Sequence, residues 1–261
     1  MTQLTTDNIS LNAGQTELFA QVNLSLASGK LTCLVGPNGA GKSSLLTCLA
    51  GLKKPATGTV LLNGQDLTGM SSTERAKQLS YLPQNRQLSW PISVEDAVAL
   101  GRFAYGGTPA RLSEADQTAV DEALDICELN GLRKRATDTL SGGELSRVHF
   151  ARAFAGKASL LIADEPLTAL DPKHQLRVMR LIQRFTENGG TALVVLHDIA
   201  LAAEFADVLL WMRFGRLVDE GSPAKTLTVQ NMSRVFDVSA RIEDGRLISI
   251  ADAQGSNKRC R

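Results

Sequence analysis

The feature that most constrains this chain is a glycine-rich loop between an apolar strand-like run and an apolar helix-like run. The run L-T-C-L-V begins at Leu31, the loop G-P-N-G-A-G-K-S spans residues 36–43, and S-L-L-T-C-L-A follows. Glycines permit backbone conformations closed to other residues, so that successive N–H groups point inward at phosphate oxygens, and the helix adds the positive end of its dipole. The spacing is that of a triphosphate-binding loop in its strand–loop–helix setting.

We therefore predict that this loop binds the phosphates of a nucleotide. Lys42 is expected to reach the β- and γ-phosphates, and the Ser43 hydroxyl to bind Mg²⁺. The predicted nucleotide-binding residues are consecutive: Gly36, Pro37, Asn38, Gly39, Ala40, Gly41, Lys42, Ser43 and Ser44. Kinases and GTPases share such loops, so the loop indicates the class of ligand and leaves the function open.

An acidic pair ends a second apolar run, L-L-I-A-D-E-P, which starts at Leu160. Neighbouring side chains of a strand point to opposite faces, but the chain turns at the end of a strand and both can then line one cleft. Asp164 suits the outer coordination shell of Mg²⁺. Glu165 suits a base that polarises an attacking water, which is worth roughly 10²- to 10⁴-fold in rate. The alternative is an exposed acidic pair that caps a turn.

The remaining apolar runs indicate an α/β fold. Runs near Ala192 and Val208 also alternate with helix-period segments, as expected for a mainly parallel sheet covered on both faces. Residues 7–28 and 59–63 alternate in polarity and predict a small antiparallel sheet. After about Gly215 we expect a hairpin-like piece, a helix over 229–236, a strand-like end and a frayed tail.

Between residues 86 and 139 the pattern becomes helical. Ser113 followed by Asp116 is typical of a helix start, and Val120, Leu124 and Cys127 then follow at helical spacing. The segment predicts a helical lobe inserted between strands of the core.

Composition argues against several classes of protein. The 28 Lys plus Arg and 27 Asp plus Glu nearly balance, so no nucleic-acid partner is expected. No secretory signal is found, and no apolar run approaches the roughly 18 to 20 residues needed to cross a bilayer, so we expect a soluble chain. Scattered cysteines indicate reduced thiols in the core and no disulfide framework: Cys33, Cys48, Cys127 and Cys260.

Further short motifs follow the loop in a fixed order. They are Gln84 in Y-L-P-Q, then Leu140, Ser141, Gly142, Gly143 and Glu144, then the acidic pair, Asp171 at the end of A-L-D, and His197 in V-L-H-D. In these motifs and their order the chain resembles, over nearly its whole length, the ATP-binding subunits of ABC transporters. The resemblance implies a P-loop NTPase core with a mainly parallel sheet, a small antiparallel β subdomain and an inserted helical subdomain.

The resemblance also implies how the chain divides. Residues 1–261 would form a single ABC ATPase domain. The nucleotide-binding core would take about 1–85 and 160–235, the helical subdomain with the L-S-G-G-E signature about 86–158, and the C-terminal tail about 236–261.

By the same resemblance, ATP and Mg²⁺ are sandwiched between two copies of the chain. Residues 140–144 would act on the partner's ATP, with Ser141 and Gly143 opening a helix whose N-terminus binds the γ-phosphate. Asp171 would cross the dimer interface. The implied catalytic residues are Glu165, His197 and Gln84, and the implied metal-binding residues are Ser43, Gln84 and Asp164.

Some positions depart from the family's pattern. Glu144 and Leu145 stand where Gln and a basic residue are usual, and an acid there weakens the field of a phosphate-binding helix. Leu167 stands where Thr is common. The aromatic residue that stacks on adenine is missing, because Ala13 lies near its expected place, and Phe19 is the candidate substitute.

A narrower resemblance is to importers of iron–siderophore, haem and cobalamin complexes. It rests on E-R-A-K-Q-L-S-Y-L-P-Q, V-E-D-A-V-A-L-G-R, R-L-S-E-A-D and V-F-D-V-S-A-R-I. It implies a peripheral position on the cytoplasmic face of the inner membrane, transmembrane permease subunits, and indirectly a periplasmic or surface substrate-binding protein. Residues 84–102 would form the groove for a permease helix, with Trp90 and Pro91 at the contact.

Three alternatives remain open. One is a soluble ABC ATPase of DNA repair, translation or iron–sulfur assembly, although the chain shows no coiled-coil insertion, second cassette or basic surface. The second is an importer subunit for another substrate. The third is a P-loop kinase or GTPase, neither of which needs L-S-G-G.

Overall fold

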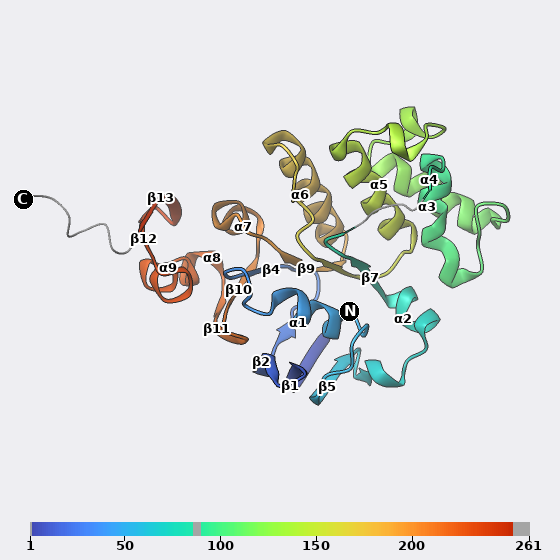
Figure 1. Cartoon of the computed structure of the whole chain (residues 1–261). Helices are drawn as coiled ribbons and strands as arrows, with labels where there is room; N and C mark the ends of the chain where they lie inside the picture. Colours follow the sequence, from blue (N-terminus) through green and yellow to red (C-terminus); the bar gives the residue numbers. More distant parts are fainter. Residues whose placement is uncertain (1, 86–89, 253–261) are drawn as a thin grey trace, which may run out of the picture.

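The computed structural model describes residues 2–85 and 90–252 (Figure 1). Its centre is a six-stranded sheet of order β11-β10-β4-β9-β8-β7. All neighbouring strands are parallel except β11, which returns antiparallel to β10. The strands are β4 (Leu31–Val35), β7 (Leu79–Leu82), β8 (Leu160–Ala163), β9 (Thr191–Val195), β10 (Val208–Arg213) and β11 (Arg216–Gly221). The predicted mainly parallel sheet is confirmed.

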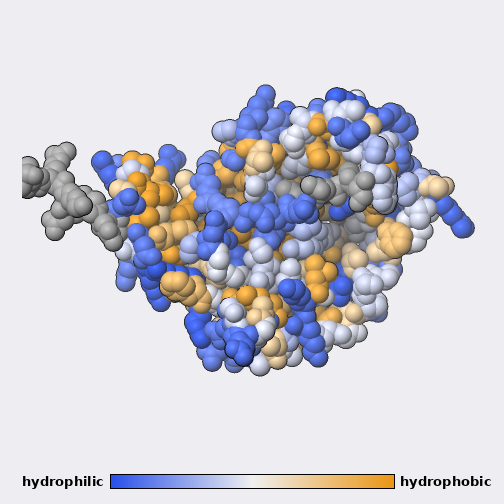
Figure 2. Space-filling model, in the orientation of Figure 1, coloured by the Kyte–Doolittle hydropathy of each residue, from blue (hydrophilic) through white to orange (hydrophobic). Residues whose placement is uncertain are grey.

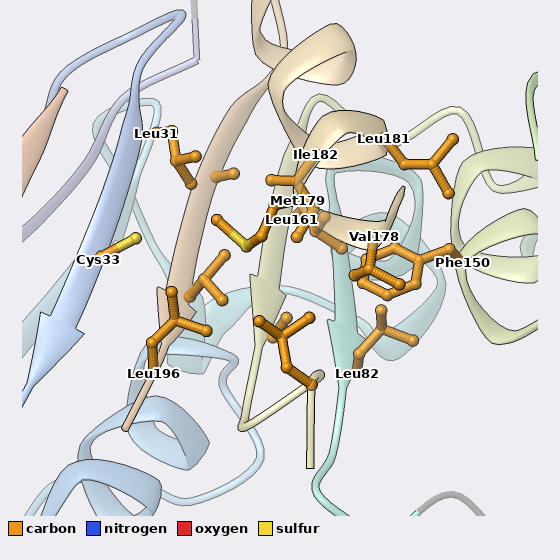
Figure 3. Close-up of a cluster of buried hydrophobic side chains, with 14 of the residues drawn as sticks. Leu31, Cys33, Leu82, Phe150, Leu161, Val178, Met179, Leu181, Ile182 and Leu196 are labelled. Atoms are coloured by element: carbon orange, nitrogen blue, oxygen red, sulfur yellow. The ribbon is translucent and has the colours of Figure 1, made fainter. Parts of the chain in front are cut away.

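The central strands are apolar on both faces because both faces are covered. β4, β8 and β9 are buried at every residue. Successive residues of β4 enter different cores: Cys33 belongs to one apolar cluster and Leu34 to another. The first cluster includes Val178 and Met179 of α6 (Pro172–Glu187), which lie over the sheet next to Phe150 (Figure 3). The second includes α1 (Lys42–Leu49).

A smaller antiparallel sheet packs against the α1 side through the second cluster. Its strands are β1 (Leu4–Ala13), β2 (Thr16–Val22), β3 (Ser25–Leu26), β5 (Thr57–Leu62) and β6 (Gln65–Asp66). The predicted antiparallel sheet is confirmed, and it starts at Leu4. The 3₁₀ helix η1 (Leu67–Gly69) and the helix α2 (Ser72–Gln78) lead from it to β7.

The helical region lies between β7 and β8 in the chain and beside β7 in space (Figure 1). Its helices are α3 (Val94–Ala99), η2 (Leu100–Tyr105), α4 (Glu114–Ile126), η3 (Asn130–Leu132), η4 (Thr137–Thr139) and α5 (Gly142–Ala155). The predicted helix start is confirmed, because the Ser113 hydroxyl and the Asp116 carboxylate form a reciprocal capping box. Val120, Leu124 and Cys127 are buried as expected. We keep 86–158 as the proposed helical subdomain.

The C-terminal part consists of α7 (Ile199–Phe205), α8 (Pro223–Thr226), α9 (Val229–Phe236) and a hairpin of β12 (Val238–Glu243) and β13 (Arg246–Asp252). Phe236 of α9 packs edge-on against the fully buried Trp211 of β10, with 6.3 Å between ring centroids. The helix and strands expected here are confirmed. The expected frayed tail, with Cys260, lies outside the described residues.

Two local elements were not predicted. The edge strand β7 is only four residues long, and Ser80 and Tyr81 are half-buried, so it lacks the continuous apolar run of its neighbours. The helix α2 buries no residue and is instead defined by its start, where Ser71 and Glu74 form a capping box.

The surface is chemically mixed. Apolar residues appear in separate patches among polar ones on the face shown in Figure 2. Within residues 2–85 and 90–252, no helix combines the length and apolar character that crossing a bilayer requires. The described cysteines, Cys33, Cys48 and Cys127, are buried free thiols, as expected of small core residues.

Candidate nucleotide-binding site

The glycine-rich loop connects the end of β4 to the start of α1, as predicted. Two of its glycines are required for different reasons. A Cβ on Gly36 would overlap the Met212 carbonyl of β10, so this position needs a close backbone approach. Gly41 is the N-cap of α1 and has a φ of 95°, which other residues rarely adopt. Gly215 donates its N–H to the Ala40 carbonyl at 3.0 Å and ties the loop to the β10–β11 turn.

Lys42 is held inside this loop. Its Nζ donates to the carbonyl oxygens of Gly36 at 2.8 Å and Pro37 at 2.9 Å, and the residue is 5% exposed. Burial lowers the pKa of the ammonium group, and the charges of Glu165 and Asp164 oppose this effect. Neutral carbonyl oxygens stabilise a buried cation less well than anionic oxygens do. Exchange of these carbonyl partners of Lys42 for phosphate oxygens is therefore favourable.

The acidic pair follows β8 directly. Glu165 has a φ of 47°, in the left-handed region, so the chain turns sharply after Asp164. Asp164 and Glu165 follow the carboxyl end of β8, and the phosphate loop follows that of the parallel strand β4, so all lie at the same end of the sheet. A strained backbone at such a position is typical of functional sites.

Each oxygen of the Glu165 carboxylate contacts a different side chain. His197 Nε2 lies 2.6 Å from Oε1, and Gln84 donates from Nε2 to Oε2 at 2.6 Å. His197, Glu165 and Gln84 follow the carboxyl ends of the neighbouring strands β9, β8 and β7, respectively. The structure therefore brings together the three residues that the sequence suggested as catalytic. The Thr168 hydroxyl adds a longer bond of 3.3 Å to Oε2, which the sequence analysis missed.

Asp164 and Ser43 fit a magnesium site. Burial raises the pKa of Asp164, and a hydrogen bond from the Ser43 hydroxyl opposes the increase. Asp164 Oδ1 is buried and has no hydrogen-bond partner among the described residues. Across residues 2–85 and 90–252 there is no cluster of three His, Cys, Asp or Glu that could enclose a metal alone. Mg²⁺ is usually held by one or two protein oxygens together with phosphates, which suits this arrangement.

The signature residues form a second cluster. Ser141 is the N-cap of α5, and its N–H and hydroxyl both contact the Glu144 carboxylate, at 2.8 and 2.9 Å. These bonds lower the pKa of Glu144. The acid that departs from the family's pattern thus completes a capping box. Asp171 caps α6 nearby, and no hydrogen bond or ion pair among the described residues joins this cluster to Glu165.

The structure excludes Phe19 as the adenine platform. Its side chain is 0% exposed in the apolar cluster under β2, and Ala13 is exposed without offering a ring. Leu167, the other unusual residue, is buried in the first apolar cluster.

Comparison with known proteins agrees with this geometry. Residues 19–168 match the family model described as ABC transporter. The chain belongs to the ABC transporter family. As a member of that family it is an ATP-binding, ATP-hydrolysing subunit.

Several similar relatives are named as import ATP-binding proteins. This chain is 35% identical to the hemin import ATP-binding protein of Rhizobium meliloti, and the alignment covers 90% of this chain and 91% of the relative. It is 33% identical to the petrobactin import ATP-binding protein of Bacillus subtilis, covering 90% and 93%.

Solved structures show the same fold. An inward-facing ABC transporter, described as of a metal-chelate type, superposes with a TM-score of 0.80 at 25% identity, covering 96% of this chain and 97% of that chain. A dimeric bacterial ABC cassette superposes with a TM-score of 0.74 at 27% identity, covering 84% and 98%. The fold class inferred from the sequence is confirmed.

Proposed function

We propose that this chain is the ATPase subunit of a membrane importer for iron chelates of the siderophore or haem type. The observation that carries the catalytic half of the proposal is the Glu165 carboxylate, held at 2.6 Å by both His197 and Gln84 beside the phosphate loop. The names of the relatives support the substrate class.

In the proposed reaction, Lys42 releases the carbonyls of its own loop and binds the β- and γ-phosphates. Glu165 orients and polarises the attacking water, while His197 fixes that carboxylate and faces the γ-phosphate. Ser43 and Asp164 would hold Mg²⁺, with Gln84 beside it, and the ion would neutralise charge on the phosphates.

Two copies would share each nucleotide. The N-terminus of α5, with Ser141 as its cap, presents the positive end of a helix dipole and would face the γ-phosphate bound by the other copy. Asp171 would lie at the interface. The dimeric relative of known structure supports this arrangement.

The permease would dock away from the nucleotide. A groove of about 440 Å³ lies between α2, β7, η2 and α5, and the exposed Leu100 and Phe103 line it. Only part of the segment 84–102 reaches this groove. Trp90 is 68% exposed and Pro91 is exposed, but neither lines it. A peripheral position on the cytoplasmic face of the membrane follows from such docking.

The test is reconstitution with the permease in liposomes. Iron-chelate-loaded binding protein should raise ATP hydrolysis and drive uptake, and Glu165→Gln should abolish both. Phe103→Asp should keep the hydrolysis of the isolated chain and lose stimulation and uptake, because it places a charge in the apolar groove. The proposal fails if binding protein loaded with iron chelates never stimulates hydrolysis, or if only unrelated substrates do.

A further inference from the structure

His174, which the sequence analysis did not single out, lies between two parts of the proposed site. It is in the first turn of α6, and its Nδ1 lies 2.9 and 2.8 Å from the two oxygens of Asp171. Its backbone N–H also donates to Asp171 at 2.9 Å. These bonds lower the pKa of Asp171. An ionised carboxylate only accepts hydrogen bonds, so Nδ1 carries the proton.

The opposite edge of the imidazole rests on the signature helix. A methyl group on Gly143 would overlap Cδ2 and Nε2 of His174. Gly143 lies in the first turn of α5, so the ring packs directly against backbone that only a glycine leaves accessible. The imidazole thus fills the space between the starts of α5 and α6.

The two helices are also joined at their other ends. Phe154 of α5 stacks on Phe185 of α6, with ring centroids 5.4 Å apart and an angle of 15°. That contact is apolar and far along the helices from their N-termini. At their N-terminal ends, the two helices meet through the ring of His174 packed against Gly143.

We propose that His174 is a positioning residue that holds Asp171 and the start of α5 as one rigid unit facing the partner copy. The proposal deepens the shared-nucleotide arrangement and rests on it. Ser141 and Gly143 would act on the partner's ATP, and Asp171 would lie at the interface between copies. Both then reach the partner's nucleotide in a fixed relation, set by a single imidazole.

The proposal predicts that His174 serves the partner's ATP and not the ATP in its own loop. A mixed dimer separates the two. One copy carries Lys42→Ala and contributes only its signature helix, and the other carries Ser141→Arg and contributes only its loop. His174→Ala in the signature-contributing copy should lower kcat about tenfold or more with little change in KM, since small misplacements of catalytic groups are costly. The same change in the loop-contributing copy should alter kcat less than about twofold.

The controls address folding and chemistry. Lys173→Ala, an exposed neighbour in the same turn, should leave kcat unchanged in either copy. His174→Asn keeps a donor for Asp171 but loses the ring edge, and His174→Phe keeps the ring but loses the donor. Each of these two variants should lower kcat when it is placed in the signature-contributing copy and not when it is placed in the loop-contributing copy. Thermal unfolding of each variant shows whether the chain remains folded.

A size exchange gives a second measurement. Gly143→Ala should impair the signature-contributing copy, and adding His174→Ala should restore part of its kcat by removing the overlap. A mixed dimer without His174 changes that shows no activity would overturn the shared site itself. An active mixed dimer in which His174→Ala has no effect, or acts only in the loop-contributing copy, would overturn the role of His174 alone.

Discussion

At the scale of single residues, the position of Glu165 depends on a backbone conformation that its side chain disfavours. The φ of 47° turns the chain after β8 and brings the carboxylate between His197 and Gln84. Left-handed conformations at residues other than glycine persist only where surrounding contacts enforce them. Here His197 and Gln84 each hold the Glu165 carboxylate at 2.6 Å.

Glu165→Gln tests the role of this carboxylate. The amide keeps the shape of the side chain but cannot act as a base, so we expect Mg-ATP binding and dimer formation to persist while turnover falls at least about a hundredfold. Nucleotide binding, size-exclusion chromatography and phosphate release measure the three properties. Glu187→Gln, at the exposed end of α6, is the control. Normal turnover in Glu165→Gln would remove this residue from the mechanism.

The sequence predicted this site unevenly. The phosphate loop and the acidic pair were recognisable because each is bordered by an apolar run that is buried on both faces. Gln84 and His197 could be assigned only through the order of motifs, since no spacing places their side chains on one carboxylate. His174 gave no signal at all, because its importance arises from packing on Gly143 across two helices.

Glu144 has a second role that its departure from the family's pattern did not suggest. As an acid it weakens the field of the helix N-terminus, and S-G-G-E also has the spacing of a capping box. In the structure its carboxylate bonds to Ser141. The local pattern contained this information, and the comparison with the family's usual residue obscured it.

At the scale of elements, the helical region depends on a buried ion pair. Arg102 of η2 donates from Nε to Asp116 of α4 at 2.8 Å, with both side chains 7% exposed, and from Nη1 to the Ala155 carbonyl of α5 at 2.8 Å. One guanidinium therefore connects three helices, and its charge is largely buried.

Asp116→Ala should destabilise the chain by about 3–5 kcal/mol, because it leaves the Arg102 charge buried without its partner. Urea unfolding followed by circular dichroism gives the free energy of unfolding. Asp125→Ala, on the exposed side of the same helix, should change it by about 0.5 kcal/mol or less. An equal effect of both substitutions would contradict the assigned importance of the ion pair.

Lowering the pH should reduce the stability contributed by contacts at the start of α3. Arg133 and Lys134 contact Glu95 at 3.0 and 2.5 Å and lower its pKa to about 2 from 4.5. A lowered folded-state pKa gives stability that is present above the unfolded value and is lost as pH falls through the folded one. The loss from Glu95 therefore falls between about pH 4.5 and about pH 2.

Glu95→Gln isolates this contribution. The variant should be less stable than the wild type at neutral pH, and the difference should shrink toward about pH 2, as measured by urea midpoints across the range. A difference that stays constant with pH would show that the ion pairs of Glu95 do not contribute as described.

At the scale of the whole molecule, the phosphate loop and the signature helix belong to separate clusters within one chain. A second copy is the proposed means of uniting them. Lys42→Ala and Ser141→Arg should each be inactive alone, whereas their mixture should recover about a quarter of the wild-type rate if the two sites of a symmetric dimer act independently. Steady-state ATP hydrolysis at increasing mixing ratios measures the recovery. Mixtures that remain inactive would contradict the shared site.

The different exposure of the two tryptophans has a practical consequence for fluorescence measurements on this protein. Trp211 is buried in the core beside Phe236, whereas Trp90 is exposed and lies outside the lining of the groove proposed for the permease. They are the only tryptophans in the sequence, so Trp90→Phe or Trp211→Phe leaves a single tryptophan. Iodide should quench the emission of Trp90 and spare that of Trp211, which gives separate optical signals for the exposed surface around Trp90 and for unfolding of the core.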